Sequence, residues 1–268
     1  MLTYSCSFGT AIFLLHIIKK LNCLPIFCTF TIPKFIHNMK KIIGILIIFT
    51  IIFSCNKNNS DKNLIIKGQV KGLQLGNLLI KQMIQDSLVS IDSIRVDGNE
   101  NFEFHTHINE AQMMLLELPE VKDGKLLFFA EPNDTVKIFT YVESFGINPI
   151  IKGGMNQTKL NEYNQMIKKF NNKDLDLFQQ QFEARKEHFI EEADSIAEKL
   201  KSMKKKRKLY TLNFIFQNKN KSVAPYIAMM EFYNNPKVLD TIYKVLPENI
   251  KASLYGKEIK KLIDSSEK

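Results

Sequence analysis

The spacing of apolar residues changes near residue 153, and this change limits the folds that the chain can adopt. Between residues 64 and 152 the apolar residues form short runs separated by glycine, proline, asparagine and aspartate. Short, closely spaced runs of this kind are typical of the strands of an antiparallel sandwich. After residue 154 the apolar residues recur at helical spacing over longer segments. The sequence therefore predicts an α+β chain, with an N-terminal antiparallel β-sandwich followed by an all-helical C-terminal region.

Turn signals containing glycine separate the expected strands. Gly72 and Gly76 lie between "LIIKGQV" and "NLLIKQM", where they favour a hairpin. The dipeptide Asp97-Gly98 is a strong turn signal between "SLVSIDSIRV" and "NFEFHTHI". Further runs at "QMMLLELP", "KLLFFA", "TVKIFTYV" and "NPIIKGG" complete the predicted sandwich.

The helical region is predicted to contain one long helix with an apolar side. Gly153-Gly154 is expected to end the last strand, and "NQTKLNEYNQMIKKF" forms the first helical segment. A longer helix is predicted to start near Asp174, because an acidic residue suits a helix N-terminus. Five apolar residues recur in it every seven positions and define the interaction stripe: Leu175, Phe182, Phe189, Ile196 and Met203. We expect this stripe to pack against shorter helices at "APYIAMMEFY" and "TIYKVL"; a second copy or a partner protein is the alternative.

Residues 39–54 have the parts of a secretory signal peptide. In "MKKIIGILIIFTIIFSC" two lysines precede an uncharged apolar run, which ends at Ser54 and Cys55. This pattern resembles the lipobox of bacterial lipoproteins. The resemblance implies cleavage between Ser54 and Cys55 and lipidation of Cys55. The folded part would then be held by lipid at the bacterial cell envelope, in the periplasm or at the cell surface. A buried strand or an uncleaved anchor is the alternative for this segment.

The prediction of a signal peptide also sets the domain boundaries. Residues 1–38 are interpreted as an upstream extension from a misassigned start, with Met39 as the initiator; an additional membrane hairpin is the alternative. Residues 55–62 are predicted to be a polar tether. The sandwich is predicted over residues 63–153 and the helical region over residues 154–268.

Charge and cysteine content exclude several classes of function. The formal net charge of +9 includes five lysines before Cys55 and no acidic residue there, so the rest of the chain has 32 basic and 28 acidic residues, a net charge of +4. So small a surplus does not indicate a nucleic-acid binder. No cysteine follows Cys55, which excludes a disulfide, a thiolate metal site and a nucleophilic thiol from that part of the chain. No cofactor is predicted.

Two other motifs contain residues that could form functional sites. Glu103, His105 and His107 alternate with apolar residues and would project from one face of a strand, where carboxylate and imidazole could bind a divalent metal. We favour an ordinary polar strand face, and no metal site is predicted. The basic run from Lys204 to Lys208 is interpreted as the solvated end of a helix, with contact to anionic lipid as the alternative.

Several segments resemble a known family. The segments "IIKGQVKGL", "IDSIRVDGNENFEF", "FFAEPNDTVKI" and "IKGGMNQTKLNEYNQ" are similar to domain of unknown function 4369. "NKSVAPYIAMMEFY" and "SLYGKEIKKLI" resemble the helical connector of the same proteins. Members are lipoproteins in which a thioredoxin-like AhpC/TSA or TlpA-type domain usually follows and carries a Cys-x-x-Cys pair. This sequence has no such pair and is expected to be without that domain, so the resemblance implies no activity for it.

Two classes of function remain. The first is a non-enzymatic binding or scaffolding module of the envelope that holds a protein partner. The second is an enzyme, either an accessory subunit of a thiol–disulfide system with a separately encoded thioredoxin-like protein, or an envelope hydrolase. The missing cysteines and catalytic motifs favour the first class.

Overall fold

The computed structural model describes residues 62–84 and 87–266, which belong to one compact unit. The signal peptide, Ser54, Cys55 and the predictions about residues 1–61 lie outside these ranges. No helix within the described ranges is long and apolar enough to cross a bilayer.

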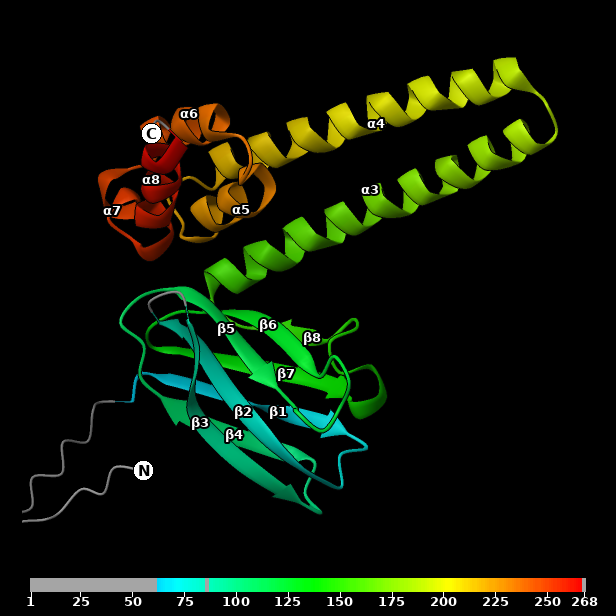
Figure 1. Ribbon diagram of the computed structural model, residues 1–268. Coiled ribbons are helices and arrows are strands. Elements are labelled where there is room, and N and C mark those ends of the chain that lie inside the picture. Colours follow the sequence, from blue (N-terminus) through cyan, green and yellow to red (C-terminus); the bar gives the residue numbers. More distant parts are fainter. Residues whose placement is uncertain (1–61, 85–86, 267–268) are drawn as a thin grey trace, which may run out of the picture. The chain divides into compact units, whose positions relative to one another are not determined.

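The strands of the described residues lie between residues 64 and 152 (Figure 1). In the described part of the chain they are β1 (Leu64–Lys71), β2 (Leu75–Ile84), β3 (Ser87–Asp97), β4 (Asn101–Thr106), β5 (Gln112–Glu117), β6 (Lys125–Ala130), β7 (Asp134–Tyr141) and β8 (Ile150–Lys152). A short 3-10 helix, η1 (Val142–Ser144), follows β7.

The strands form two four-stranded sheets that enclose an apolar core. Sheet A has the order β4-β1-β7-β8, and sheet B has the order β3-β2-β5-β6. Fully buried side chains from both sheets fill the space between them, including Ile66, Phe104 and Val136 from sheet A and Leu78, Leu116 and Phe128 from sheet B. Most neighbouring strands are antiparallel, so the predicted α+β class with an antiparallel-rich sandwich is confirmed.

The hairpin expected at Gly72 and Gly76 does not form, and the predicted turn at Asp97-Gly98 also connects two strands that do not pair with each other. Gly72 and Gly98 both have positive φ, 87° and 73°, as a turn requires. The connections they make run between the sheets, because β1 and β4 belong to sheet A whereas β2 and β3 belong to sheet B. A turn signal specifies where the chain changes direction but not which strand it then pairs with.

One pair of strands is parallel and comes unusually close. β1 pairs with β7 in parallel register, and Gly68 lies opposite Ile138. A Cβ atom at residue 68 would lie 1.7 Å from the carbonyl oxygen of Ile138. Only glycine allows β7 to approach β1 in this way.

The helices follow the sandwich. They are α3 (Met155–Lys186), α4 (Ile190–Gln217), α5 (Val223–Phe232), α6 (Pro236–Val245), α7 (Glu248–Lys251) and α8 (Leu254–Ser266). The predicted helices at "APYIAMMEFY" and "TIYKVL" correspond to α5 and α6. The segment "NIKASLYGKEIKKLI" is divided between α7 and α8.

The prediction of one long helix that starts near Asp174 is wrong. α3 passes through Asp174 without a break, and the chain reverses at residues 187–189 before α4 begins. His188 makes this reversal with a φ of 62°. The small side chains of Ala184 and Ala193 are buried together beside the turn, where they let α3 and α4 approach closely. The reversal therefore depends on contacts between the two helices, which helical spacing in the sequence does not record.

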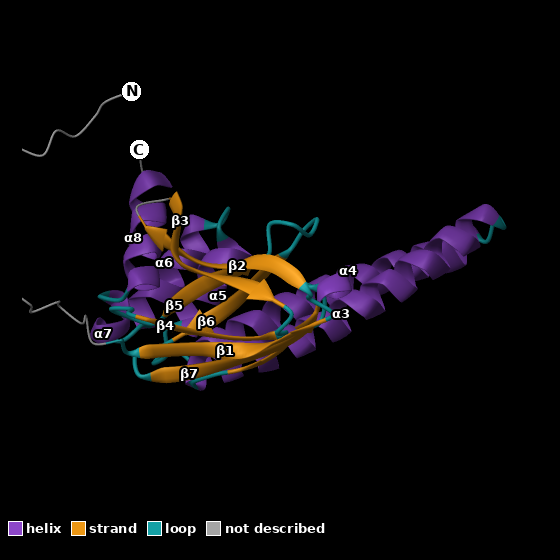
Figure 2. Ribbon diagram, turned by 90° about the horizontal axis from the view of Figure 1, so that it is seen from below, coloured by secondary structure: helices purple, strands orange, loops and turns teal. Residues whose placement is uncertain are grey.

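The helices pack on the outer face of sheet B through a second apolar core (Figure 2). Phe129 projects from β6 into this core and is fully buried. Its ring centroid lies 5.9 Å from those of Tyr226 in α5 and Tyr255 in α8. The helices thus cover the part of sheet B around Phe129, whereas Leu127 of β6 and Leu88 of β3 are exposed. The outer face of sheet A carries the polar positions of β1, β4 and β7.

Candidate functional site

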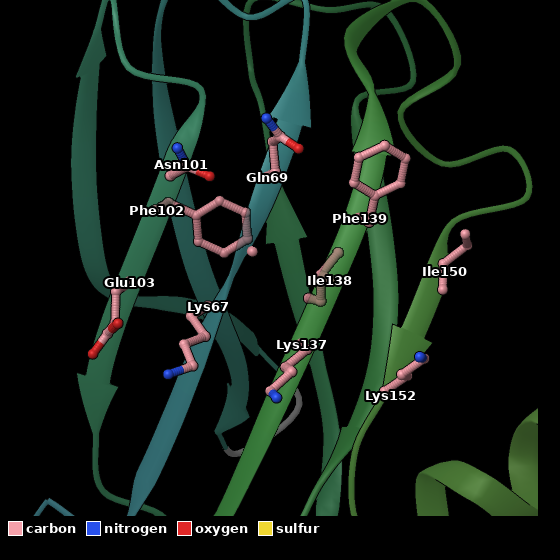
Figure 3. A pocket seen from close by; sticks show the side chains of 11 residues that line it. Lys67, Gln69, Asn101, Phe102, Glu103, Lys137, Ile138, Phe139, Ile150 and Lys152 are labelled. Atoms are coloured by element: carbon pink, nitrogen blue, oxygen red, sulfur yellow. The ribbon is translucent and has the colours of Figure 1, made fainter.

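The outer face of sheet A contains a hollow of about 510 Å³ (Figure 3). Side chains of β1, β4, β7 and β8 line it, so it spans all four strands of the sheet. The volume is within the range of sites that bind small molecules, roughly 300–1,000 Å³. The lining side chains fall into two rows that run across the strands.

The first row consists of three lysines and one glutamate. Lys67 pairs with Lys137 across the β1–β7 register, and Lys137 pairs with Lys152 across the β7–β8 register. Glu103 lies at the far end, opposite Lys67. Strands are about 4.8 Å apart, so three ammonium-bearing side chains originate within roughly 10 Å of one another. Among the described residues none of the three lysines forms a salt bridge.

The second row is part amide and part apolar. Asn101, Gln69 and Phe139 are register partners on β4, β1 and β7, and Ile150 of β8 follows them. The amide nitrogen of Gln69 donates to Glu100 at 3.1 Å, and the carbonyl oxygen of the same amide is an additional acceptor. The Phe139 ring makes an edge contact with Tyr141, whose ring centroid is 5.4 Å away. The hollow therefore places cations, amides and an aromatic ring side by side.

The structure does not bring Glu103, His105 and His107 together as one group. The structure confirms that Glu103 and His105 project to the exposed side of β4, with Phe102 and Phe104 in the core. Glu103 and His105 bond to each other at 2.7 Å, whereas His107 lies beyond β4 and contacts Asn109. No group of three or more histidine, cysteine or acidic side chains within residues 62–84 and 87–266 is arranged to hold a metal ion.

A second candidate surface is the end of the α3–α4 hairpin. Leu175, Phe178 and Phe182 lie along α3 and are 61–67% exposed. Phe189 and Ile190, at the reversal, are 59% and 57% exposed. We call these five residues the hairpin surface. They do not pack against α5 or α6, so the expected intramolecular packing is wrong for them.

The interaction stripe predicted from the sequence is divided by this hairpin. Leu175 and Phe182 are exposed on α3, and Phe189 lies in the reversal. Ile196 is buried on α4, and Met203 packs beside it. The structure therefore leaves Leu175, Phe182 and Phe189 exposed at the surface and assigns Ile196 and Met203 to the contact between the helices. Their role in binding stays a prediction.

The basic run at Lys204 to Lys208 is in the middle of a helix. The prediction that it forms a helix end is wrong, because α4 continues to Gln217. Arg207 donates to both carboxylate oxygens of Glu231 in α5, at 2.9 and 3.0 Å. Lys208 lies over the ring of Phe232. At least two members of the run therefore hold α4 against α5.

Carboxylates from the sandwich hold the first turn of α3. The backbone N–H of Asn156 donates to Glu131 at 2.7 Å, and that of Gly154 donates to Asp134. Helix N-termini favour negative charge, so these contacts fix the direction in which α3 leaves β8. Gly153-Gly154 ends the last strand before the first helix, as the sequence predicts.

Two amides of α3 complete this junction. Gln157 accepts the N–H of Phe129 at 2.6 Å, and Asn156 accepts the N–H of Val223 at 2.8 Å. Both amide side chains are buried. Buried backbone N–H groups need such partners, so α3 joins the sheet to α5 by hydrogen bonds as well as by apolar contact.

The segments that make this junction are among those that resemble domain of unknown function 4369. Comparison with known protein families tests this resemblance. Residues 64–160 match the family model Domain of unknown function (DUF4369). The chain contains a DUF4369 domain. No curated protein and no solved structure matches the chain. The DUF4369 domain covers the whole sandwich and the first turns of α3, and thus the hollow of sheet A and the α3 side of the junction. The hairpin surface lies outside the matched residues.

Sequence reasoning missed the lysines of the hollow. Lys67, Lys137 and Lys152 are separated by up to 85 positions in the sequence, and each is an ordinary polar residue of its own strand. Their strand periodicity assigns them to exposed faces. The parallel register of β1 and β7, together with the antiparallel register of β7 and β8, places them in one row of the DUF4369 domain.

Proposed function

We propose that this protein is a lipid-anchored component of the bacterial cell envelope that binds a protein partner and has no catalytic activity of its own. The lipobox resemblance at Cys55 supports the anchor. The exposed hairpin surface supports the partner. Residues 56–268 contain no cysteine, so this part of the chain supplies no thiolate for disulfide exchange.

The observation that carries the proposal is the exposure of large apolar side chains at one end of the hairpin. Leu175, Phe178 and Phe182 follow one another at helical spacing, and Phe189 and Ile190 lie at the reversal. Single exposed apolar residues are common, but adjacent ones mark interaction sites. Removal of three phenylalanines and two aliphatic side chains from water would stabilise a complex, at roughly 25 cal/mol for each Å² buried.

The charge around the hairpin surface favours a protein over a membrane as its partner. Residues 173–194 contain seven acidic and three basic residues. Anionic lipid head groups attract basic segments and repel acidic ones. The partner is therefore expected to present an apolar centre surrounded by basic side chains.

Photo-crosslinking of the native lipidated protein in its membrane tests this proposal. A crosslinker at residue 179, beside the hairpin surface, should capture a partner protein. The double variant Phe178→Asp/Phe182→Asp should lose that partner, because charge in the apolar centre of an interface is costly. The matched variant Asn172→Asp/Gln180→Asp adds the same charge at exposed polar positions of α3 and should retain it.

Two results would contradict the proposed partner. One is an unchanged set of crosslinked proteins in Phe178→Asp/Phe182→Asp. The other is crosslinking only between copies of this chain, which would identify the surface as a self-association site.

The anchor is tested separately. Intact-mass analysis of membrane-extracted protein should show a chain that starts at an acylated Cys55. Each buried acyl CH₂ contributes about 0.8 kcal/mol, so two or three chains suffice for stable attachment. Cys55→Ala should abolish acylation. Unchanged attachment of Cys55→Ala to membranes, or a mature chain that begins at Met1, would contradict the anchor.

A further inference from the structure

We propose that the hollow on sheet A binds an acidic oligosaccharide, in which Lys67, Lys137 and Lys152 hold the acidic groups and the row formed by Asn101, Gln69 and Phe139 holds the sugar ring. This site is independent of the hairpin surface. It lies wholly within the DUF4369 domain.

The lysine row is the first part of the argument. Like charges directly opposite each other on neighbouring strands destabilise a sheet. Lys137 has a lysine on each side of it, Lys67 on β1 and Lys152 on β8. The acid at the end of the row, Glu103, is bonded to His105. An anion that contacts the row would relieve the repulsion between the lysines, so the face is suited to an acidic ligand.

The second row distinguishes an acidic sugar from other anions. An inorganic anion would be bound by the lysines alone, because contact with an aromatic ring adds nothing to its binding. Sugars have hydroxyl groups that pair with amides and an apolar C–H face that packs on aromatic rings. Asn101 and Gln69 supply amides, and Phe139 supplies the ring, directly beside the lysines.

The extent of the hollow favours an oligosaccharide over a single sugar. The three lysines span three strands, roughly 10 Å at the usual spacing. A ligand that contacts all of them needs acidic groups on more than one sugar. The rows reach β4 and β8, the two edge strands of sheet A, so a longer chain can continue past either edge.

Calorimetric titration of the detergent-solubilised, full-length lipidated protein tests the proposal. The acidic probes are an oligogalacturonate, which has carboxylates, and a chondroitin sulfate oligosaccharide, which also has sulfates. A neutral malto-oligosaccharide of equal length tests the need for charge, and tetraglutamate tests the need for sugar. We expect at least one acidic oligosaccharide to bind roughly tenfold or more tightly than either control probe, with an affinity that falls as salt rises.

Substitutions localise the binding. Lys137→Gln/Lys152→Gln should weaken binding of the acidic oligosaccharide by roughly tenfold or more. The matched control Lys122→Gln/Lys257→Gln removes the same charge from exposed positions outside sheet A and should leave the affinity unchanged. Phe139→Leu keeps an apolar side chain but removes the ring. It should weaken binding of the acidic oligosaccharide and leave any weak binding of tetraglutamate unchanged.

Several outcomes would overturn the proposal. Binding of neither acidic oligosaccharide would remove it altogether. Equal binding of tetraglutamate would show that charge alone is recognised, and equal binding of the neutral sugar would show that the lysines are not used. Unchanged affinity in Lys137→Gln/Lys152→Gln would locate the ligand elsewhere. Thermal melting of each variant confirms that a loss of binding is not a loss of folding.

Discussion

Gly154 and two carboxylates of the sandwich show how a single residue sets the direction of the helical region. The N–H groups of the first turn of α3 reach Glu131 and Asp134, and the absence of a side chain at residue 154 lets them do so. A Cβ atom there would lie 2.5 Å from a carboxylate oxygen of Glu131 and 2.9 Å from one of Asp134. These two hydrogen bonds hold the segment "FFAEPNDTVKI" close to the segment "IKGGMNQ" in the folded domain.

Gly154→Ala is predicted to lower the free energy of unfolding by about 1–3 kcal/mol, because the added methyl must displace both carboxylates. Thermal melting measures this loss. Gly153→Ala is the matched control, since its Cβ would meet the nearest atom, the Gln157 Cβ, at 3.2 Å. Equal losses in the two variants would show that the carboxylates move freely and do not hold α3.

Tyr255 of α8 has a buried side chain whose hydroxyl lies at the contact between α8 and β5. Its hydroxyl accepts the N–H of Met113 at 2.7 Å. Burial raises the pKa of Tyr255 well above its ordinary value of 10.0, and burial does the same to the pKa of Tyr163. The folded state therefore retains protons that the unfolded chain releases. Stability that is complete below about pH 10 is lost as the pH rises above that value.

Two effects are predicted for Tyr255→Phe. At neutral pH the variant should lose about 1–3 kcal/mol, because the Met113 N–H is left without its acceptor. Between about pH 9 and pH 11 its melting temperature should fall less steeply than that of the wild type. Tyr233→Phe, at an exposed position, is the control and should follow the wild-type curve. A parallel fall of Tyr255→Phe and wild type would mean that Tyr255 does not cause the alkaline loss.

At the scale of elements, the α3–α4 hairpin has a narrow contact between its helices and an exposed outer side. Near the reversal the buried contact consists of Leu177, Ala184, Ala193 and Ile196, with Leu200 and Met203 partly buried beside them. This cluster is separate from the cores of the sandwich and the shorter helices. The end of the hairpin is therefore expected to open locally, without unfolding of the whole chain.

Hydrogen exchange distinguishes the two sides of the hairpin. Ile196→Asp should increase amide exchange at residues 174–203 strongly, because a buried, unpaired carboxylate costs several kcal/mol. Phe182→Asp should leave exchange there nearly unchanged, because its side chain already faces water. If the amides of Ile196→Asp were as well protected as those of Phe182→Asp, the two helices would not depend on the buried contact around Ile196. Increased exchange in Phe182→Asp would show that the hairpin surface packs against the chain itself.

The sequence predicts elements better than it predicts their partners. Alternation in "NFEFHT" correctly assigns Phe102 and Phe104 to the core, since facing is a local property of a strand. The β1–β7 pair is beyond such reasoning, because about 70 residues separate strands that no turn connects. The reversal at His188 has no glycine or proline to mark it. The hollow and the hairpin surface depend on these two features, so neither was predicted in its actual form.

At the scale of the whole described unit, adjacent residues of one strand bind the two cores together. On β6, Phe128 projects into the sandwich core and Phe129 into the helical core, and both are fully buried. Gln157, Glu110 and Tyr255 accept hydrogen bonds from backbone N–H groups across the same boundary. The sandwich without its helices would expose Phe129 and leave buried backbone groups unpaired. The sandwich and the helices differ in secondary structure, but each needs the other to bury Phe129 and to pair the backbone groups at their common boundary.

The sandwich and the shorter helices are therefore predicted to unfold as one cooperative unit, and Phe128→Ala and Phe129→Ala form a matched pair to test this. Each should cost about 3–5 kcal/mol, because each leaves a cavity in a packed core. If the unit is cooperative, each variant lowers the protection of the slowest-exchanging amides in β1, β5, α5 and α8 by the same free energy. Native-state hydrogen exchange measures all four elements at once. Loss of protection confined to the strands in Phe128→Ala, or to the helices in Phe129→Ala, would show two separate folding units. Calorimetry should show a single transition if the unit is cooperative, and two transitions if the strands and the helices unfold separately.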